Sequence, residues 1–206
     1  MSGLQGGTAV VTGAGSGLGA AMAGAFAAEG MAVAVLDINR EAAESVAAGL
    51  EAGGASALGR AVDVADRETL DAAAAEVAAR FGACNVVAAN VGVMQFGPLE
   101  RITADDWQWL LSLNVVGTAN TVNAFLPSLR AADGPRHVVL TSSMAALVSD
   151  AAPGRVHHDQ VRDHGIWRRA PAGARRRRHR RDGRVPERDD HDAPREQSRG
   201  ATVGAR

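Results

Sequence analysis

Residues 8–30 combine a short apolar run, a glycine-rich turn and an alanine-rich segment that ends in a glycine. Val10 and Val11 are typical of a buried strand, and the segment from Gly17 onward predicts a helix packed closely against that strand. Glycine adopts positive φ and lets a ligand approach the backbone, while a helix N-terminus offers N–H groups to a phosphate. The stretch predicts a binding site for the pyrophosphate of a dinucleotide; a flexible surface loop is the alternative.

A second apolar run follows the predicted helix and ends in Asp37, close to the ~20-residue offset at which an acidic side chain meets the adenosine ribose. A carboxylate there accepts hydrogen bonds from the ribose 2′-hydroxyl and repels a 2′-phosphate. Ile38, the next residue, supplies no cation for that phosphate. We therefore expect NAD as cofactor in preference to NADP, with Arg40 as the residue that keeps NADP as the alternative.

The glycine spacing, Thr12-Gly13-x-x-x-Gly17-x-Gly19, resembles the cofactor motif of the short-chain dehydrogenase/reductase family. The longer-spaced dinucleotide motif is matched only as Gly15-x-Gly17-x-x-Ala20. The resemblance covers residues 1–154 and implies an oxidoreductase that interconverts a secondary alcohol and a ketone by hydride transfer to or from a nicotinamide cofactor. It implies that the cofactor contacts Gly13, Ser16, Gly17, Leu18, Gly19, Asp37, Ile38, Asp63, Val64, Asn90 and Gly92.

Apolar runs and helical patterns alternate along this part of the chain. Helices are expected over residues 40–53, 67–81 and 103–132, and further strands over residues 57–64, 85–90 and 137–141. Asp66 is expected to cap the second of these helices, and Thr103 with Asp106 resembles a capping box for the third. The fold class is α/β: a Rossmann-like, doubly wound parallel sheet that stops after the fifth strand and is followed by a disordered basic tail.

Four of these positions acquire specific roles from the resemblance. Asp63 and Val64 would border the adenine; a strand-end aspartate that caps the next turn is the alternative for Asp63. The family usually has Asn-Asn-Ala-Gly where this chain has Ala89-Asn90-Val91-Gly92, so two of the four positions match. Asn90 would still tie its strand to a neighbour, and Gly92 would still admit the cofactor's ribose.

The catalytic candidates are Asn114 and Ser143. Asparagine is a poor residue for the middle of a helix, and the family has an explanation for Asn114: the helix bends there and the Asn holds a water in a proton relay. A solvent-facing asparagine is the alternative. Ser143 follows a predicted strand and matches the family's serine, which hydrogen-bonds the substrate carbonyl or hydroxyl.

The family's general acid is a tyrosine with a lysine four residues later, and neither residue type occurs in this chain. The expected positions hold Val156 and Gln160. Back-translating residues 155–165 with G/C-rich codons and starting one nucleotide later allows Ala-Tyr-Thr-Thr-Thr-Lys-Phe-Ala-Ile-Met-Gly, which restores the pair at these positions. We therefore hypothesise that the sequence after Gly154 is out of frame.

The composition also changes at Gly154. The preceding part has 7 arginines and 15 acidic residues, a net charge of −8, whereas the remainder has 15 arginines and 8 acidic residues, a net charge of +7. We expect residues 1–154 to form an incomplete dinucleotide-binding domain and residues 155–206 to be an Arg-rich, disordered tail. Less favoured alternatives are a nucleic-acid contact through residues 175–181, a metal site using His157, His158, His164 and Asp159, and a histidine that replaces the tyrosine as general acid. We expect the protein to bind no metal ion.

With 206 residues, 46% of them hydrophobic, the chain is long enough for one domain with a core. It has no apolar run of membrane-spanning length and no signal-peptide pattern, so we expect a cytoplasmic protein with no membrane partner. The lone Cys84 is expected to be a small buried residue.

A small hydrophobic alcohol or ketone is expected as substrate, facing residues 93–96 and 145–148. We also expect impaired activity, a compromised homo-oligomer and an unprotected sheet edge at residues 137–141. A non-catalytic NAD-binding remnant is the alternative function.

Overall fold

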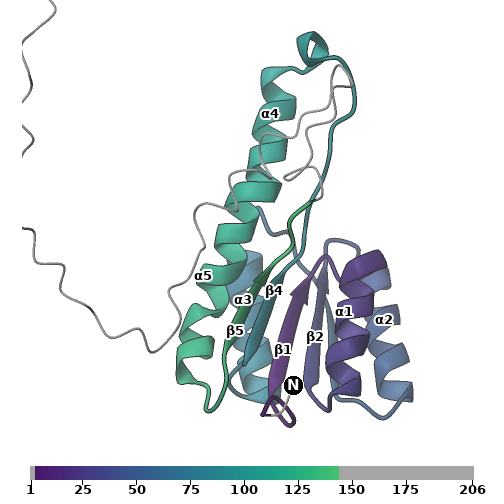
Figure 1. Ribbon diagram of the computed structural model, residues 1–206, viewed down its shortest axis with the longest axis vertical. Helices are drawn as coiled ribbons and strands as arrows, with labels where there is room; N and C mark the ends of the chain where they lie inside the picture. Colours follow the sequence, from purple (N-terminus) through teal and green to yellow (C-terminus); the bar gives the residue numbers. More distant parts are fainter. Residues whose placement is uncertain (1–2, 144–206) are drawn as a thin grey trace, which may run out of the picture. The chain divides into compact units, whose positions relative to one another are not determined.

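The structure, a computed structural model, describes residues 3–143, in which strands and helices alternate. The five strands form one parallel sheet in the order β3-β2-β1-β4-β5, with β1 in the centre and β3 and β5 at the edges (Figure 1). The strands are β1 (Thr8–Thr12), β2 (Ala32–Asp37), β3 (Ala57–Ala61), β4 (Val86–Ala89) and β5 (His137–Leu140). The helices are α1 (Gly17–Ala28), α2 (Arg40–Ala52), α3 (Arg67–Phe81), α4 (Ala104–Leu111) and α5 (Thr118–Ala131), with a 3-10 turn η1 (Leu99–Arg101) and a π-helical turn η2 (Ser112–Gly117).

Helices cover both faces of the sheet, because each strand directs successive side chains to opposite sides. Val10 packs in the core that α3 and α5 close with residues such as Phe125. Val11 packs in the core that α1 and α2 close through small residues such as Ala23 and Ala43. Figure 1 shows α1 and α2 on one side of the strands and α3 and α5 on the other. The predicted Rossmann-like, doubly wound sheet is confirmed.

The helices begin where the sequence supplies caps. The Asp66 carboxylate accepts the N–H of Glu68 at 2.9 Å, and Thr103 and Asp106 form a reciprocal capping box at the start of α4. These bonds from Thr103 hold the pKa of Asp106 below its usual value. Both predicted caps are confirmed. The strand expected over residues 57–64 ends earlier, at Ala61, because the chain turns where the Asp63 carboxylate accepts the N–H of Ala65 at 2.9 Å.

The helix expected over residues 103–132 contains one π-helical turn, η2, between α4 and α5. Gly117, at the end of this turn, lies directly against Val64: a Cβ on Gly117 would lie 2.6 Å from Val64 Cγ2. The irregular turn lets the helix pass the loop after β3 at this close approach. Asn114 lies within this π-helical turn, so the helix is irregular at the position where a bend was expected.

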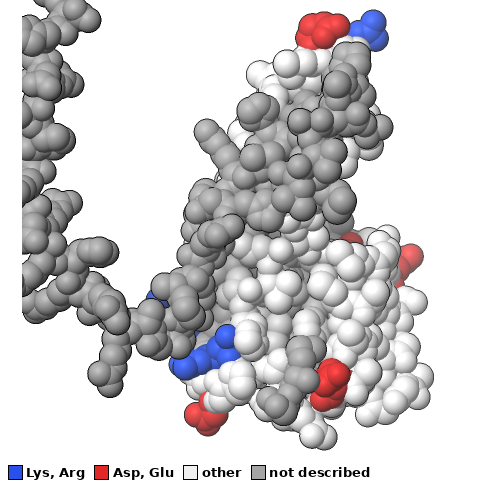
Figure 2. Space-filling view, viewed as in Figure 1, with Lys and Arg blue, Asp and Glu red and all other residues white. Residues whose placement is uncertain are grey.

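Strand β5 is the outermost strand on its side within residues 3–143, where its one partner is β4. His137 and Val138 are exposed, and Val139 and Leu140 are half-buried. Among the described residues, no helix is both long enough and apolar enough to cross a bilayer. Figure 2 shows a few charged groups of both signs separated by wide uncharged surface on this face.

Candidate functional site

A cleft of about 500 Å³ lies at the carboxyl edge of the sheet, where β1 stands between β2 and β4. Parallel α/β sheets bind ligands at this edge, at the point where the strand order reverses. The cleft is lined by Gly13, Ser16, Gly17, Leu18, Gly19, Asp37, Ile38, Val62, Asp63, Val64, Asn90, Val91, Gly92, Val93, Leu113, Thr141, Ser142 and Ser143. Every residue expected to contact the cofactor, together with Ser143, therefore lies on one cavity.

The turn between β1 and α1 requires glycine at three positions. Gly13 and Gly17 have φ of 63° and 52°, which disfavour residues with a Cβ. A Cβ on Gly19 would lie 2.1 Å from the carbonyl oxygen of Gly13. These three positions are those of the 13/17/19 spacing, and they bring the start of α1 against the end of β1.

The N-terminus of α1 opens onto the cleft. The Ser16 side chain makes no capping hydrogen bond, and the first intrahelical acceptor, Ser16 O, bonds Ala20 N at 3.1 Å. The N–H groups of Gly17, Leu18 and Gly19 precede that bond and are the donors that a helix start offers to an anion. With no Cβ on Gly17, backbone is open to a ligand at this point. These features fit the pyrophosphate of a dinucleotide.

Asp37 supports the same turn from the end of β2. Its Oδ2 accepts the Gly15 N–H and its Oδ1 accepts the Asn39 N–H, both at 2.9 Å. The Gly15 N–H is therefore directed to Asp37, which leaves the N–H groups of residues 17–19 as the donors at the start of α1. Ile38, beside Asp37, is 71% exposed at the rim of the cleft.

Asp63 and Val64 form the wall of the cleft that lies after β3. The Ala65 N–H donates to Asp63 Oδ1, so Asp63 caps the turn that follows β3. This is the capping role given above as the alternative for Asp63. Val64 is buried, and its carbonyl accepts the Asn120 side-chain amide at 3.2 Å. The turn and the wall are thus fixed before any ligand binds.

Asn90 connects three strands. Its backbone N–H donates to Thr12 Oγ1 at 3.2 Å, its Nδ2 donates to Gly13 O at 3.2 Å, and its Oδ1 accepts the Thr141 hydroxyl at 2.9 Å. The tie to a neighbouring strand expected for Asn90 is present. No sequence motif assigns a role to Thr141, whose one signal is a hydroxyl-bearing side chain at the end of an otherwise apolar strand.

Asn114 lies beneath the cleft and is not among the lining residues. Its Oδ1 accepts the Val93 N–H at 2.8 Å and its Nδ2 donates to Val93 O at 2.9 Å, so the amide clamps the segment after β4 to η2. The side chain is 4% exposed, and the solvent-facing alternative for Asn114 is therefore wrong. A relay role for Asn114 stays a prediction.

Ser143 lies at the end of the described chain, three residues beyond β5, and lines the cleft with Ser142. Of the residues expected to face a substrate, Val93 lines the cleft, whereas Phe96 is 68% exposed and is not part of its lining. The predictions for residues 145–148, Val156, Gln160 and the tail, including the metal and nucleic-acid alternatives, concern residues outside the described range. Within residues 3–143 no group of three or more His, Cys, Asp or Glu could hold a metal ion.

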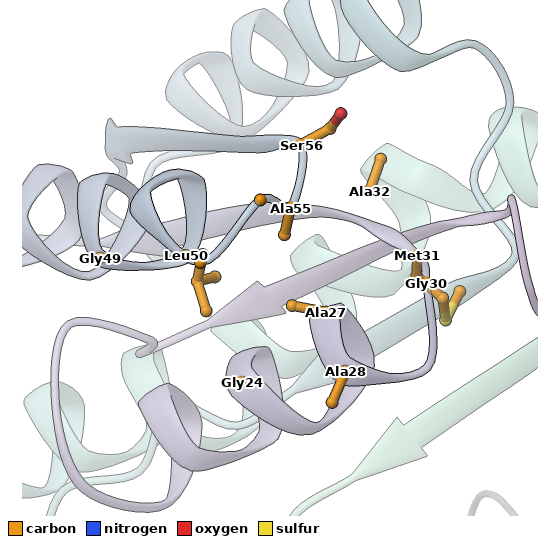
Figure 3. Close-up of a pocket in the computed structure, with 12 residues that line it drawn as sticks. Gly24, Ala27, Ala28, Gly30, Met31, Ala32, Gly49, Leu50, Ala55 and Ser56 are labelled. Atoms are coloured by element: carbon orange, nitrogen blue, oxygen red, sulfur yellow. The ribbon is translucent and has the colours of Figure 1, made fainter.

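A second cavity of about 450 Å³ lies at the opposite edge of the sheet, between the C-terminal ends of α1 and α2 (Figure 3). Glycines, alanines, Met31 and Leu50 line it, with Ser56 as the one polar side chain. This cavity has no charged group that could orient a ligand. Burial raises the pKa of the Cys84 thiol, which disfavours the reactive thiolate form.

The fold and the cleft together define an α/β protein of the Rossmann type. The family model for short chain dehydrogenases matches residues 7–153, and the chain belongs to this family of oxidoreductases, which use NAD or NADP.

Relatives and solved structures agree with this assignment. The chain is 37% identical over 155 residues to the C alpha-dehydrogenase of Sphingobium sp. strain SYK-6 (75% of this chain, 51% of the relative). It is 38% identical over 147 residues to the D-threitol dehydrogenase of Mycolicibacterium smegmatis (71% and 56%). The apo form of LigD from Sphingobium sp. strain SYK-6 superimposes with a TM-score of 0.72 at 33% identity, covering 78% of this chain and 68% of LigD. A short chain dehydrogenase/reductase from Burkholderia phymatum in complex with NAD gives 0.72 at 33%, covering 77% and 56%. The chain spans about half the length of these two curated relatives.

Proposed function

We propose that this protein is an NAD-dependent oxidoreductase that interconverts a small secondary alcohol and its ketone in the cytoplasm. One observation carries the proposal: the glycine turn, Asp37 and Ser143 line a single cleft at the strand-order reversal. In this proposal the N–H groups of residues 17–19 hold the pyrophosphate and Asp37 receives the ribose hydroxyls. When bound, the nicotinamide supplies or accepts the hydride, and Ser143 orients the reacting oxygen.

The preference for NAD rests on charge. Asp37 places a carboxylate at the end of β2, and its neighbour Ile38 carries no charge. A 2′-phosphate would meet this carboxylate at close range. Arg40, two residues further on, forms an exposed ion pair with Glu44 at 3.6 Å and is not among the residues that line the cleft.

The substrate proposal rests on the cleft and on relatives. Val91, Val93 and Leu113 give the cleft an apolar side. Relatives include a D-threitol dehydrogenase and a sorbitol dehydrogenase, enzymes named for small alcohols. We therefore propose a small alcohol or ketone with an apolar portion.

A second candidate is a protein that binds NAD without turnover. The printed chain contains no tyrosine and no lysine, the pair that the family uses as general acid and its partner. Loss of a positioned acid or base lowers rates by roughly 10² to 10⁴.

We further propose that residues 155–206 are not part of the dinucleotide-binding domain of residues 1–154, and that they arise from an altered reading frame.

Isothermal titration of the purified chain with NAD and NADP tests the proposal. We expect saturable NAD binding with NADP at least about tenfold weaker; no NAD binding at millimolar concentration would contradict it. NADH formation with a panel of secondary alcohols separates the candidates, because the second predicts binding without turnover.

A further inference from the structure

Thr141 occupies a position in the cleft to which neither the glycine motif nor the serine assigns a role. It follows β5 directly, and its N–H donates to Ala89 O at 3.1 Å, which continues the pairing of β5 with β4. Valine or isoleucine would suit such a strand end equally well. The hydroxyl group is therefore the feature that needs an explanation.

The Thr141 hydroxyl donates to Asn90 Oδ1 at 2.9 Å, and Asn90 Nδ2 donates to Gly13 O at 3.2 Å. A carbonyl such as Gly13 O only accepts, so the amide nitrogen must face it and the amide oxygen must face Thr141. The hydroxyl thus satisfies the oxygen that this orientation directs toward β5. The three groups form one chain of hydrogen bonds from the end of β5 to the glycine turn.

At the other end of this series of hydrogen bonds, the Gly13 carbonyl group has little freedom to reorient. It is wedged between the Asn90 amide and Gly19, where a Cβ would lie 2.1 Å from its oxygen. The same peptide leads into Ala14 and Gly15, whose N–H groups bond Leu36 O at 3.0 Å and Asp37 Oδ2 at 2.9 Å. The orientation of the Gly13 carbonyl therefore sets the turn from which α1 starts.

We propose that Thr141 is a positioning residue for the cofactor: its hydroxyl fixes the Asn90 amide, which holds the Gly13 carbonyl and so preorganises the turn that receives the pyrophosphate. This inference rests on the proposed binding of NAD. It makes the strand that leads to Ser143 part of the cofactor cradle, so the substrate side and the phosphate side of the cleft share one network.

Thr141→Val removes the hydroxyl and keeps the shape of the side chain. We expect its NAD affinity, measured by titration calorimetry, to fall about tenfold, as leaving a partly buried acceptor unpaired would produce. Thr141→Ser keeps the hydroxyl and should stay within about twofold of the unsubstituted chain. The matched control is Thr8→Val at the far end of β1, where the hydroxyl donates to Phe81 O at 3.2 Å; this variant should also stay within about twofold.

Thr141→Ser and Thr141→Ala repeat the comparison without the methyl group, in case the valine variant does not fold. In an Asn90→Ala background, Thr141→Val should have no further effect, because the two residues act through one amide. An unchanged affinity in Thr141→Val or Thr141→Ala, an equal loss in Thr8→Val, or additive losses with Asn90→Ala would overturn the inference. Absence of NAD binding by the unsubstituted chain would instead overturn the proposed function, and with it this inference.

Discussion

The Asp37 carboxylate accepts the Gly15 N–H at 2.9 Å, so the end of β2 and the turn after β1 are joined through a side chain. The second oxygen of the same carboxylate accepts the Asn39 N–H at 2.9 Å. Both oxygens are therefore acceptors for backbone donors. Asp37 supports the glycine turn in the described structure in addition to the ribose contact proposed for it.

Asp37→Asn should weaken NAD binding although the substitution preserves size. An amide has one acceptor, so its NH₂ group would oppose either the Gly15 or the Asn39 N–H, and the 2′-phosphate would no longer meet a full negative charge. We expect roughly a tenfold loss of NAD affinity and a smaller gap between NAD and NADP, measured by calorimetry. Asp71→Asn, at an exposed carboxylate that pairs with Arg67 on α3, is the control and should leave both affinities unchanged.

Gly19→Ala should abolish NAD binding and destabilise the protein by about 2 kcal/mol or more, because the new Cβ would meet the Gly13 carbonyl at 2.1 Å. Gly24→Ala, on the same helix, meets nothing within 4 Å and should stabilise α1 by about 0.5–1 kcal/mol. Urea denaturation gives both free energies of unfolding. Equal effects of the two substitutions would contradict the packing argument at the turn.

Asn114→Ala should destabilise the protein by about 2–4 kcal/mol, since it leaves the N–H and C=O of Val93 without their side-chain partners. The matched substitution Asn123→Ala, at an exposed position of α5, should be neutral or raise stability by a few tenths of a kcal/mol through helix propensity. Chemical denaturation distinguishes the two. A neutral Asn114→Ala would show that the clamp on Val93 contributes nothing to folding.

The ion pair between Arg60 on β3 and Glu76 on α3 predicts a pH dependence of stability. The Arg60 hydrogen bond lowers the pKa of Glu76 from 4.5, so the pair stabilises the fold above the unfolded-state value and loses this contribution as pH falls through the lower, folded-state value. Both side chains are about a third exposed or more, so Glu76→Gln should cost only about 0.5 kcal/mol at pH 7, and the difference should shrink as the pH falls through the lowered pKa of Glu76. Denaturation at several pH values measures it, with the exposed Glu100→Gln on η1 as the control. A pH-independent difference would contradict the assignment.

A peptide map of the protein from its natural source tests the reading-frame hypothesis. If the sequence after Gly154 is out of frame, a peptide with a Tyr-x-x-x-Lys pair at positions 156 and 160 should follow that glycine. The intact mass should then differ from that of the 206 printed residues. Arginine-rich peptides matching residues 155–206 would refute the hypothesis and leave NAD binding without turnover as the favoured function.

The sequence alone determined the features that depend on local chemistry. The caps at Asp66 and Thr103 and the alternation of apolar runs predicted the doubly wound sheet. The spacing of Gly13, Gly17 and Gly19 predicted the glycine turn that lines the cleft. Each of these signals lies within one turn or one strand, where residue type and spacing fix the backbone. The predicted bounds of several elements differ from the observed ones by about one residue, and the largest difference is at β3, which ends at Ala61 and not at residue 64.

The tertiary structure decided which side chains meet. Thr141 and Asn90 are 51 residues apart and Asn90 and Gly13 are 77 apart, so no local pattern reports their hydrogen bonds. The same holds for Asn114, whose amide meets the backbone of a residue 21 positions earlier. Such contacts arise because β1, β4 and β5 end at one edge of the sheet and the π-helical turn passes beneath it, an arrangement that exists only once the whole sheet has formed.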